Sequence, residues 1–134
     1  MLYRTSKSPS ILLLSSLAAV IPAPTRSLYA STKSFSLLLY QSLSIEHPHI
    51  SFSLIIPSTV EGDFRASAVD AGPIREFYPK KTRLKSLAVA QRCIQAVDAR
   101  HKTVFIPSHM RLAHILYWLF PRFIEWRARV KYRF

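Results

Sequence analysis

The sequence predicts an α/β fold built on a parallel sheet, with an amphipathic helix near its C-terminal end. Two apolar runs, over residues 10–14 and 50–57, predict buried strands on either side of a helical pattern. A strand, a helix and a second strand in this order are typical of a parallel sheet, because parallel strands need a long crossover between them. Later in the chain, residues 86–100 predict a helix and residues 103–106 a short last strand. The expected inward positions of that later helix are Leu87, Ala90, Ile94 and Val97.

The composition fits one modest core without disulfides. With 134 residues and 49% hydrophobic residues, the chain is too apolar for a disordered tail. Cys93 is the single cysteine, which excludes an intramolecular disulfide and a cysteine metal site. The histidines form no metal-ligand pattern, so we expect no metal. The formal net charge of +12 favours anionic partners.

The N-terminal residues combine features of a secretory signal with those of a strand. Basic residues precede the apolar stretch over residues 11–21, as they do in a signal peptide. Ser15 and Ser16 interrupt that stretch, however, and Pro22 and Pro24 crowd the region where cleavage would occur. We therefore expect a buried strand at residues 10–14.

Three polar side chains after this first strand form a candidate catalytic set. Tyr29 and Lys33 are four residues apart on the helix expected over residues 27–46, so their side chains share one face. An ammonium close to a phenol favours the phenolate, and such a tyrosine can exchange a proton with a carbonyl or alcohol oxygen. Ser16 stands at the end of the preceding strand, where its hydroxyl can hold the same oxygen in place. The alternative is an ordinary pair on a surface helix.

In order and spacing, these residues resemble the short-chain dehydrogenase/reductase family. The resemblance is carried by Leu-Leu-Leu-Ser-Ser-Leu-Ala-Ala, by Tyr-Ala-Ser-Thr-Lys beginning thirteen residues after Ser16, and by the Ile-Ile-Pro that ends the second strand. It covers residues 10–108. It implies Ser16 as the hydroxyl that polarises the substrate, Tyr29 as general acid/base, and Lys33 as the group that assists Tyr29 and grips the nicotinamide ribose.

The resemblance also implies a cofactor and a fold. The cofactor would be NADP or NAD, and the fold the C-terminal portion of a Rossmann-like doubly wound parallel sheet. No Gly-rich turn is present to hold a pyrophosphate at a helix N-terminus, so we expect a truncated fragment that is inactive or weakly active alone. The residues implied to contact the cofactor are Tyr29, Lys33, Pro57, Thr59 and Val60.

The C-terminal segment, residues 109–134, is expected to follow an irregular N-terminus (1–8) and a partial catalytic domain (9–108). From Met110 to about residue 130, apolar residues recur at helical spacing, with Trp118 and Trp126 among them and arginines beside them. The uncharged stretch is too short to span a bilayer, so we expect one basic amphipathic helix lying on a membrane surface. The alternative is a helix docked on its own domain or on a second copy.

The predicted function is that of an NAD(P)-dependent oxidoreductase acting on a carbonyl or secondary alcohol of a lipophilic, steroid- or lipid-like substrate. The resemblance to membrane-associated hydroxysteroid dehydrogenases implies the endoplasmic reticulum membrane, with the cytoplasm as the alternative, and a homodimer through the catalytic helix. Phe64, Phe77 and Tyr78 are expected to line the substrate pocket. The competing hypothesis is a non-catalytic remnant that binds a membrane surface or a partner. A nucleic-acid partner is not expected, because the basic residues interleave with an apolar helix face.

Overall fold

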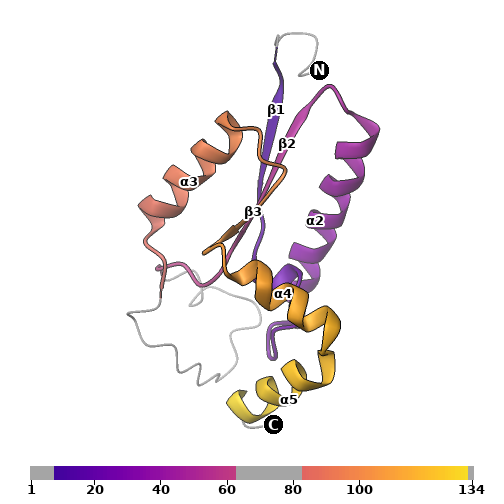
Figure 1. Cartoon of the computed structure of the whole chain (residues 1–134), viewed down its shortest axis with the longest axis vertical. Helices are drawn as coiled ribbons and strands as arrows, with labels where there is room; N and C mark the ends of the chain where they lie inside the picture. Colours follow the sequence, from indigo (N-terminus) through magenta and orange to yellow (C-terminus); the bar gives the residue numbers. More distant parts are fainter. Residues whose placement is uncertain (1–7, 63–82, 133–134) are drawn as a thin grey trace.

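The computed structural model describes residues 8–62 and 83–132, which form a parallel three-stranded sheet with helices on both faces (Figure 1). The middle strand of the sheet is the second in chain order. Two more helices follow the last strand. In chain order the elements are β1 (Ser10–Leu14), the short 3-10 helix η1 (Leu17–Ala19), α2 (Ser27–Glu46), β2 (Ser51–Pro57), α3 (Ser86–Asp98), β3 (Thr103–Ile106), α4 (Met110–Leu119) and α5 (Pro121–Tyr132).

The core is centred on β2, which pairs with β1 on one side and β3 on the other. Ser10 pairs with Ser51, and the register then continues to Leu14 opposite Ile55. The side chains of Leu54, Ile55 and Ile56 are at most 1% exposed. An apolar run such as the one over residues 54–56 is typical of a strand covered on both faces, so the sequence pattern and the burial of β2 agree there.

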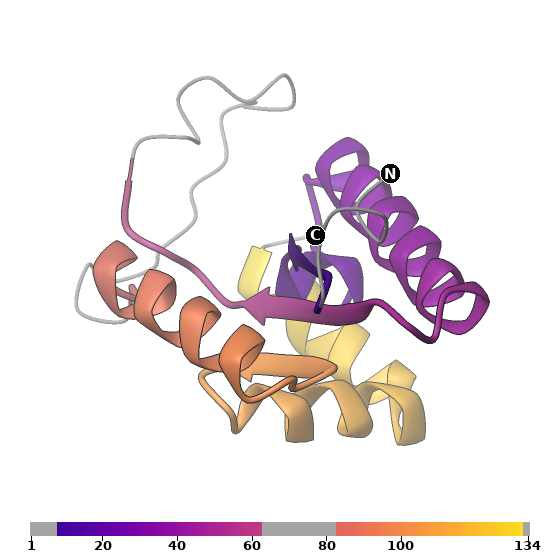
Figure 2. The ribbon, with the colours of Figure 1, turned by 90° about the horizontal axis from the view of Figure 1, so that it is seen from above.

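Helices α2 and α3 cover opposite faces of the sheet (Figure 2). Side chains alternate along β2, so Leu54 and Ile56 pack with Leu37 of α2. On the other face, the Ser53 hydroxyl donates a 3.4 Å hydrogen bond to the carbonyl of Ala96 in α3. Complete burial of an aliphatic side chain such as that of Leu54 or Ile56 stabilises the fold by roughly 1.5–3 kcal/mol.

The expected elements up to β3 are present, with small shifts at two boundaries. The strand expected from residue 50 begins at Ser51, and the helix expected to reach residue 100 ends at Asp98. Arg100 adopts a left-handed φ of 53°, a conformation that a helix cannot continue. β1 lies at the edge of the described sheet, where Leu12 and Leu14 are 38% and 48% exposed.

The buried face of α3 differs from the one expected. Val89 and Ala96 are buried and Cys93 between them is half-buried, so the stripe that meets the sheet recurs at spacings of four and three. A helix resting on a sheet buries one such stripe, and the neighbouring face lies beyond β1, the last described strand on that side. The expected inward face is therefore wrong at three positions, all exposed: Leu87, Ala90 and Ile94.

The single helix expected over residues 110–130 is wrong, because the segment forms two helices. Pro121 carries no N–H and restricts the residue before it, and Phe120 accordingly adopts a non-helical φ of −133° and ψ of 59°. The ring of His114 in α4 stacks on Phe105 of β3, with 5.8 Å between ring centroids. α5 then lies beyond the carboxyl ends of the strands (Figure 1). Within the described ranges, no helix is both long enough and apolar enough to cross a bilayer.

Replacing Ile55 with alanine tests whether β2 is the core. The Ile55→Ala substitution leaves a cavity between β2 and α3, and we expect it to lower the free energy of unfolding by about 2 to 5 kcal/mol. Ile45→Ala is the control, because Ile45 is 75% exposed on α2 and its removal should change stability by less than about 0.5 kcal/mol. Urea unfolding followed by circular dichroism measures both, and equal effects would contradict this core.

Candidate active site

A cavity of about 1240 Å³ lies at the carboxyl ends of β1 and β2. Parallel α/β sheets commonly bind ligands at this edge, where loops leave the strands. The lining comes from the segment after β1, the first turns of α2, the loop after β2, and parts of α3 and α5. All six residues proposed from the sequence for catalysis or cofactor contact line this cavity: Ser16, Tyr29, Lys33, Pro57, Thr59 and Val60.

Ser16 is held by the short helix that follows it. Its backbone is extended, and its Oγ accepts a 3.2 Å hydrogen bond from the N–H of Ala18, which makes Ser16 the N-cap of η1. That bond uses a lone pair of the oxygen and not the hydroxyl proton. The side chain is therefore fixed at the cavity while its proton can still be donated to an acceptor.

Tyr29 and Lys33 lie on one face of α2, at the end of β1. The Lys33 Nζ is 5.9 Å from the centroid of the Tyr29 ring, within the range of a cation–π contact. The same Nζ donates a 3.2 Å hydrogen bond to the carbonyl oxygen of Leu14, the last residue of β1. The ammonium is therefore held between the strand end and the phenol ring.

Two serines that the sequence did not single out fix α2 against the strand end. Ser15 is buried, its N–H donates a 2.8 Å bond to the carbonyl of Ile55, and its hydroxyl donates a 3.5 Å bond to the carbonyl of Lys33. Ser34 donates a 2.8 Å bond to the carbonyl of Ala19 in η1. Their sequence signal is weak, because serines at a strand end and on a polar helix face are common.

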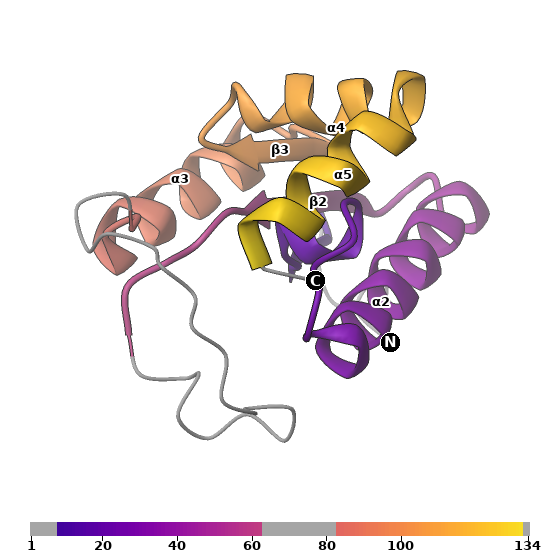
Figure 3. The same ribbon diagram turned by 90° about the horizontal axis from the view of Figure 1, so that it is seen from below.

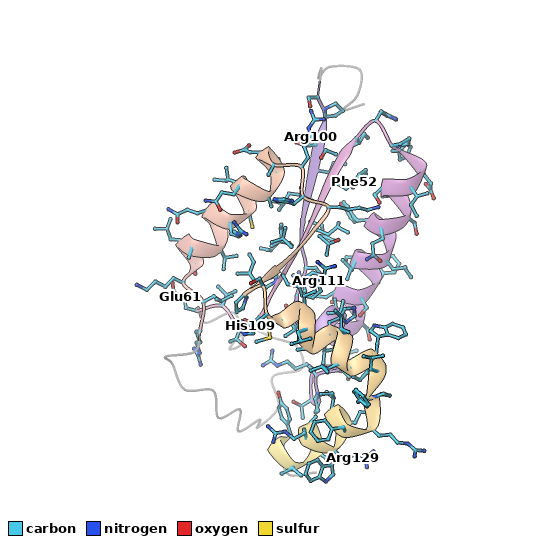
Figure 4. All side chains as sticks on the ribbon, in the orientation of Figure 1. Phe52, Glu61, Arg100, His109, Arg111 and Arg129 are labelled. Carbon is cyan, nitrogen blue, oxygen red and sulfur yellow. The ribbon has the colours of Figure 1, made fainter. Side chains whose placement is uncertain are left out.

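The loop after β2 is anchored through its backbone. The N–H of Leu84 donates to the carbonyl of Thr59, and the N–H of Glu61 donates to the carbonyl of Leu84, each at 2.9 Å. A Glu61 carboxylate oxygen accepts a 2.9 Å bond from the N–H of Ser86, the first residue of α3. Figure 4 labels Glu61, which lies beside the start of this helix. Val60 and Leu84 form a parallel β-bridge. Its two hydrogen bonds are those just described, from Leu84 to Thr59 and from Glu61 to Leu84, and they do not use the N–H of Val60.

Two parts of the cavity wall were not expected from the sequence. Cys93 lines the cavity from α3, and burial raises the pKa of its thiol. Ile124 and Ala128 line it from α5, which was expected at a membrane and not at the site. The three aromatic residues expected to line the substrate pocket, Phe64, Phe77 and Tyr78, lie outside the described residues.

Comparison with known proteins supports the family resemblance. No family model matches the chain. It is similar to 11-beta-hydroxysteroid dehydrogenase A of Arachis hypogaea, at 25% identity over 132 residues that cover 91% of the chain and 38% of that protein. In fold it matches a solved structure assigned to the short-chain dehydrogenases, from Novosphingobium aromaticivorans, with a TM-score of 0.62 and 20% identity over 92% of this chain and 39% of the other. The chain thus spans about two fifths of the length of each.

These two similarities confirm two of the sequence-based predictions. The resemblance to the short-chain dehydrogenase/reductase family is confirmed in sequence, and the α/β fold with part of a Rossmann-like parallel sheet is confirmed in structure. The roles of Ser16, Tyr29 and Lys33 stay predictions, which the geometry allows by placing all three on one cavity.

The reactivity of Cys93 follows from its burial. Because burial raises the pKa of its thiol, a smaller fraction is thiolate at neutral pH than in an unfolded chain. We expect iodoacetamide to alkylate the folded chain more slowly than the urea-denatured chain, and the difference to shrink as the pH is raised. Intact-mass spectrometry over time measures both rates, and equal rates at neutral pH would argue against a buried thiol.

Proposed function

We propose that this chain, similar in sequence and fold to the short-chain dehydrogenases/reductases, carries the proton-transfer site of an NAD(P)-dependent oxidoreductase. The observation that carries the proposal is the meeting of the Tyr29 phenol, the Lys33 ammonium and the Ser16 hydroxyl at one cavity. The chain covers about two fifths of its relatives, so the activity is proposed for the protein to which this site belongs.

The chemistry of these residues follows from their donors and charges. In carbonyl reduction, the Ser16 hydroxyl donates a hydrogen bond to the substrate oxygen, and Tyr29 gives it a proton, leaving an alcohol and a phenolate. The Lys33 ammonium favours that phenolate by its positive charge. In alcohol oxidation the proton moves the opposite way. When bound, a nicotinamide cofactor supplies or accepts the hydride.

The residues at the cavity fit the nicotinamide end of such a cofactor. The anchored loop of Pro57, Thr59 and Val60 offers backbone groups beside the catalytic set, and Lys33 offers an ammonium to ribose hydroxyls. The pyrophosphate would need donors outside this set. Donors of this kind would also determine the preference for NADP or NAD, so the proposal includes both cofactors.

A lipophilic substrate is proposed from the apolar part of the lining. Ile21, Pro22 and Ile124 contribute hydrocarbon surface to the cavity that holds the polar set. A ligand with one oxygen at Ser16 and an apolar body suits such a lining. The similarity to a protein named as a hydroxysteroid dehydrogenase supports a steroid- or lipid-like body.

Replacing the Tyr29 hydroxyl tests the proton-transfer role. In the protein to which this site belongs, Tyr29→Phe keeps the ring and removes the proton, so we expect kcat to fall at least about 100-fold. Tyr40→Phe is a matched control on the same helix, because the Tyr40 ring packs edge-on against Phe52, with 6.4 Å between centroids, and should leave turnover unchanged. The absorbance of NAD(P)H with a panel of lipophilic ketones measures turnover. Undiminished turnover in Tyr29→Phe would exclude this tyrosine as the acid/base.

A second candidate function, binding to a membrane surface, is proposed for α4 and α5. These helices expose a set of aromatic and aliphatic side chains, here called the patch, and they also carry Arg111, Arg122 and Arg129; Figure 4 labels Arg111 and Arg129. Tryptophan and arginine side chains suit the headgroup boundary of an anionic bilayer. The endoplasmic reticulum membrane is the proposed location, with the cytoplasm as the alternative. The patch consists of Trp118, Leu119, Phe120 and Phe123.

Vesicle binding tests the membrane proposal. Replacing Trp118 and Phe123 together by serine removes apolar contacts with lipid, so we expect at least about a tenfold loss of affinity for anionic phospholipid vesicles. Co-sedimentation with vesicles of mixed phosphatidylcholine and phosphatidylserine measures it. Unchanged binding in the double variant would contradict a membrane role for this patch.

The control for this experiment also addresses the proposed homodimer. Phe35 and Leu38 of α2 are 70% and 66% exposed, an apolar face that a second copy could cover. Phe35→Ser should leave vesicle binding unchanged because it lies on another helix. In sedimentation velocity the same variant should shift any dimer toward monomer, and an unshifted dimer would place its interface elsewhere.

A further inference from the structure

The structure places α5 in the wall of the candidate substrate cavity, and we propose that Ile124 and Ala128 determine which hydrocarbon bodies the site accepts. This inference rests on the proposed function, because it concerns the substrate of the same site. It gives α5 an inward task in addition to the outward, membrane-facing one proposed above.

The burial pattern of α5 identifies its inward stripe. Ile124, Ala128 and Tyr132 are half-buried, whereas the neighbouring Phe123 and Arg129 are exposed. Residues four apart on a helix lie on one face, so the three half-buried residues form one stripe. All three line the cavity. Trp126, Arg127 and Val130 line it as well but are exposed, so the stripe is the half-buried part of the α5 lining.

The direction of α5 is set by the break before it. The N–H of Phe120 donates a 2.8 Å bond to the carbonyl of Leu116, which closes α4, and the N–H of Ile124 donates a 3.3 Å bond to the carbonyl of Phe120. Proline is favoured at the first position of a helix, so Pro121 both ends α4 and begins α5. α4 itself rests on β3, and α5 thereby crosses the carboxyl ends of the strands, as Figure 3 shows from below.

The lining of the cavity combines polar and apolar side chains. Ser16, Tyr29 and Lys33 contribute hydroxyl and ammonium groups, and Ile124 and Ala128 contribute hydrocarbon. A molecule whose oxygen reaches the first set places its apolar body within reach of α5. Ala128 is the smallest member of the stripe, so it leaves a recess between Ile124 and Tyr132. A larger side chain at this position would take the space of several methylene groups.

Binding of methyl ketones of increasing chain length tests the assignment without turnover. The chain has two tryptophans, and Trp118→Phe leaves Trp126, which lines the cavity, as the sole tryptophan reporter of occupancy. In this background we expect Ala128→Leu to weaken the longest ketones by about tenfold, the effect of losing a few buried methylenes, and to leave the shortest unchanged. Ile124→Ala should weaken all but the shortest members, because it removes hydrocarbon surface at a second point of the wall.

The control variant is Arg129→Ala, one residue from Ala128 on the exposed face, and it should leave the whole series unchanged. Because Ala128→Leu could disturb folding, Ile124→Ala provides an independent test of the same wall. The assignment is overturned if Arg129→Ala matches the inward variants, if no variant changes the dependence on chain length, or if no ketone gives a saturable signal. Turnover that survives Tyr29→Phe would sink the proposed function and leave these binding results intact, so the two failures are distinguishable.

Discussion

Enclosure of β2 is the constraint on which the rest of this structure depends. Two strands cover its edges and two helices its faces, and its central side chains are almost completely buried. Parallel pairing makes the strands end at the same edge, so the register of Leu14 with Ile55 brings Ser16 and the loop after Pro57 to one cavity. These segments are far apart in the chain, and the site exists only while the sheet keeps its register.

The second requirement is that α2 be fixed against the strand end, and polar side chains do this through backbone carbonyls. Ser15 reaches the carbonyl of Lys33, Ser34 reaches that of Ala19, and Lys33 reaches that of Leu14. Bonds of this kind constrain a helix in rotation as well as in distance, because each has its own direction. The separation of Tyr29 from Ser16 is therefore set by three bonds that do not involve either side chain.

Local patterns predicted much of this architecture, and long-range choices account for what they missed. The bounds of β1, α2 and β3 follow from runs and periodicities within each segment, and the Tyr29–Lys33 face follows from helical spacing alone. The inward stripe of α3 depends on which strand lies under the helix. Helical periodicity alone cannot identify this stripe, because Leu87 and Val89 are both apolar. Pro121 is itself a sequence signal for a helix break, but the helical spacing of apolar residues continues across it. The place of α5 at the cavity depends on the angle of that break.

The hydrogen bond from Lys33 to Leu14 joins the end of the sheet to the start of the site. The N–H of Ser15 points to β2. The carbonyl of Leu14 belongs to the same peptide group, and the C=O and N–H of a trans peptide point in opposite directions. The Leu14 carbonyl therefore points away from β2, at the edge of the described sheet. An ammonium on this oxygen satisfies the last edge acceptor of β1, and a cation there disfavours continued strand pairing. The strand can therefore give way to the η1 turn at the position where Ser16 is needed. One lysine thus bonds the last carbonyl of β1 and places a positive charge beside the Tyr29 ring, so the proposed proton-transfer chemistry lies at a strand end and not on the face of the sheet.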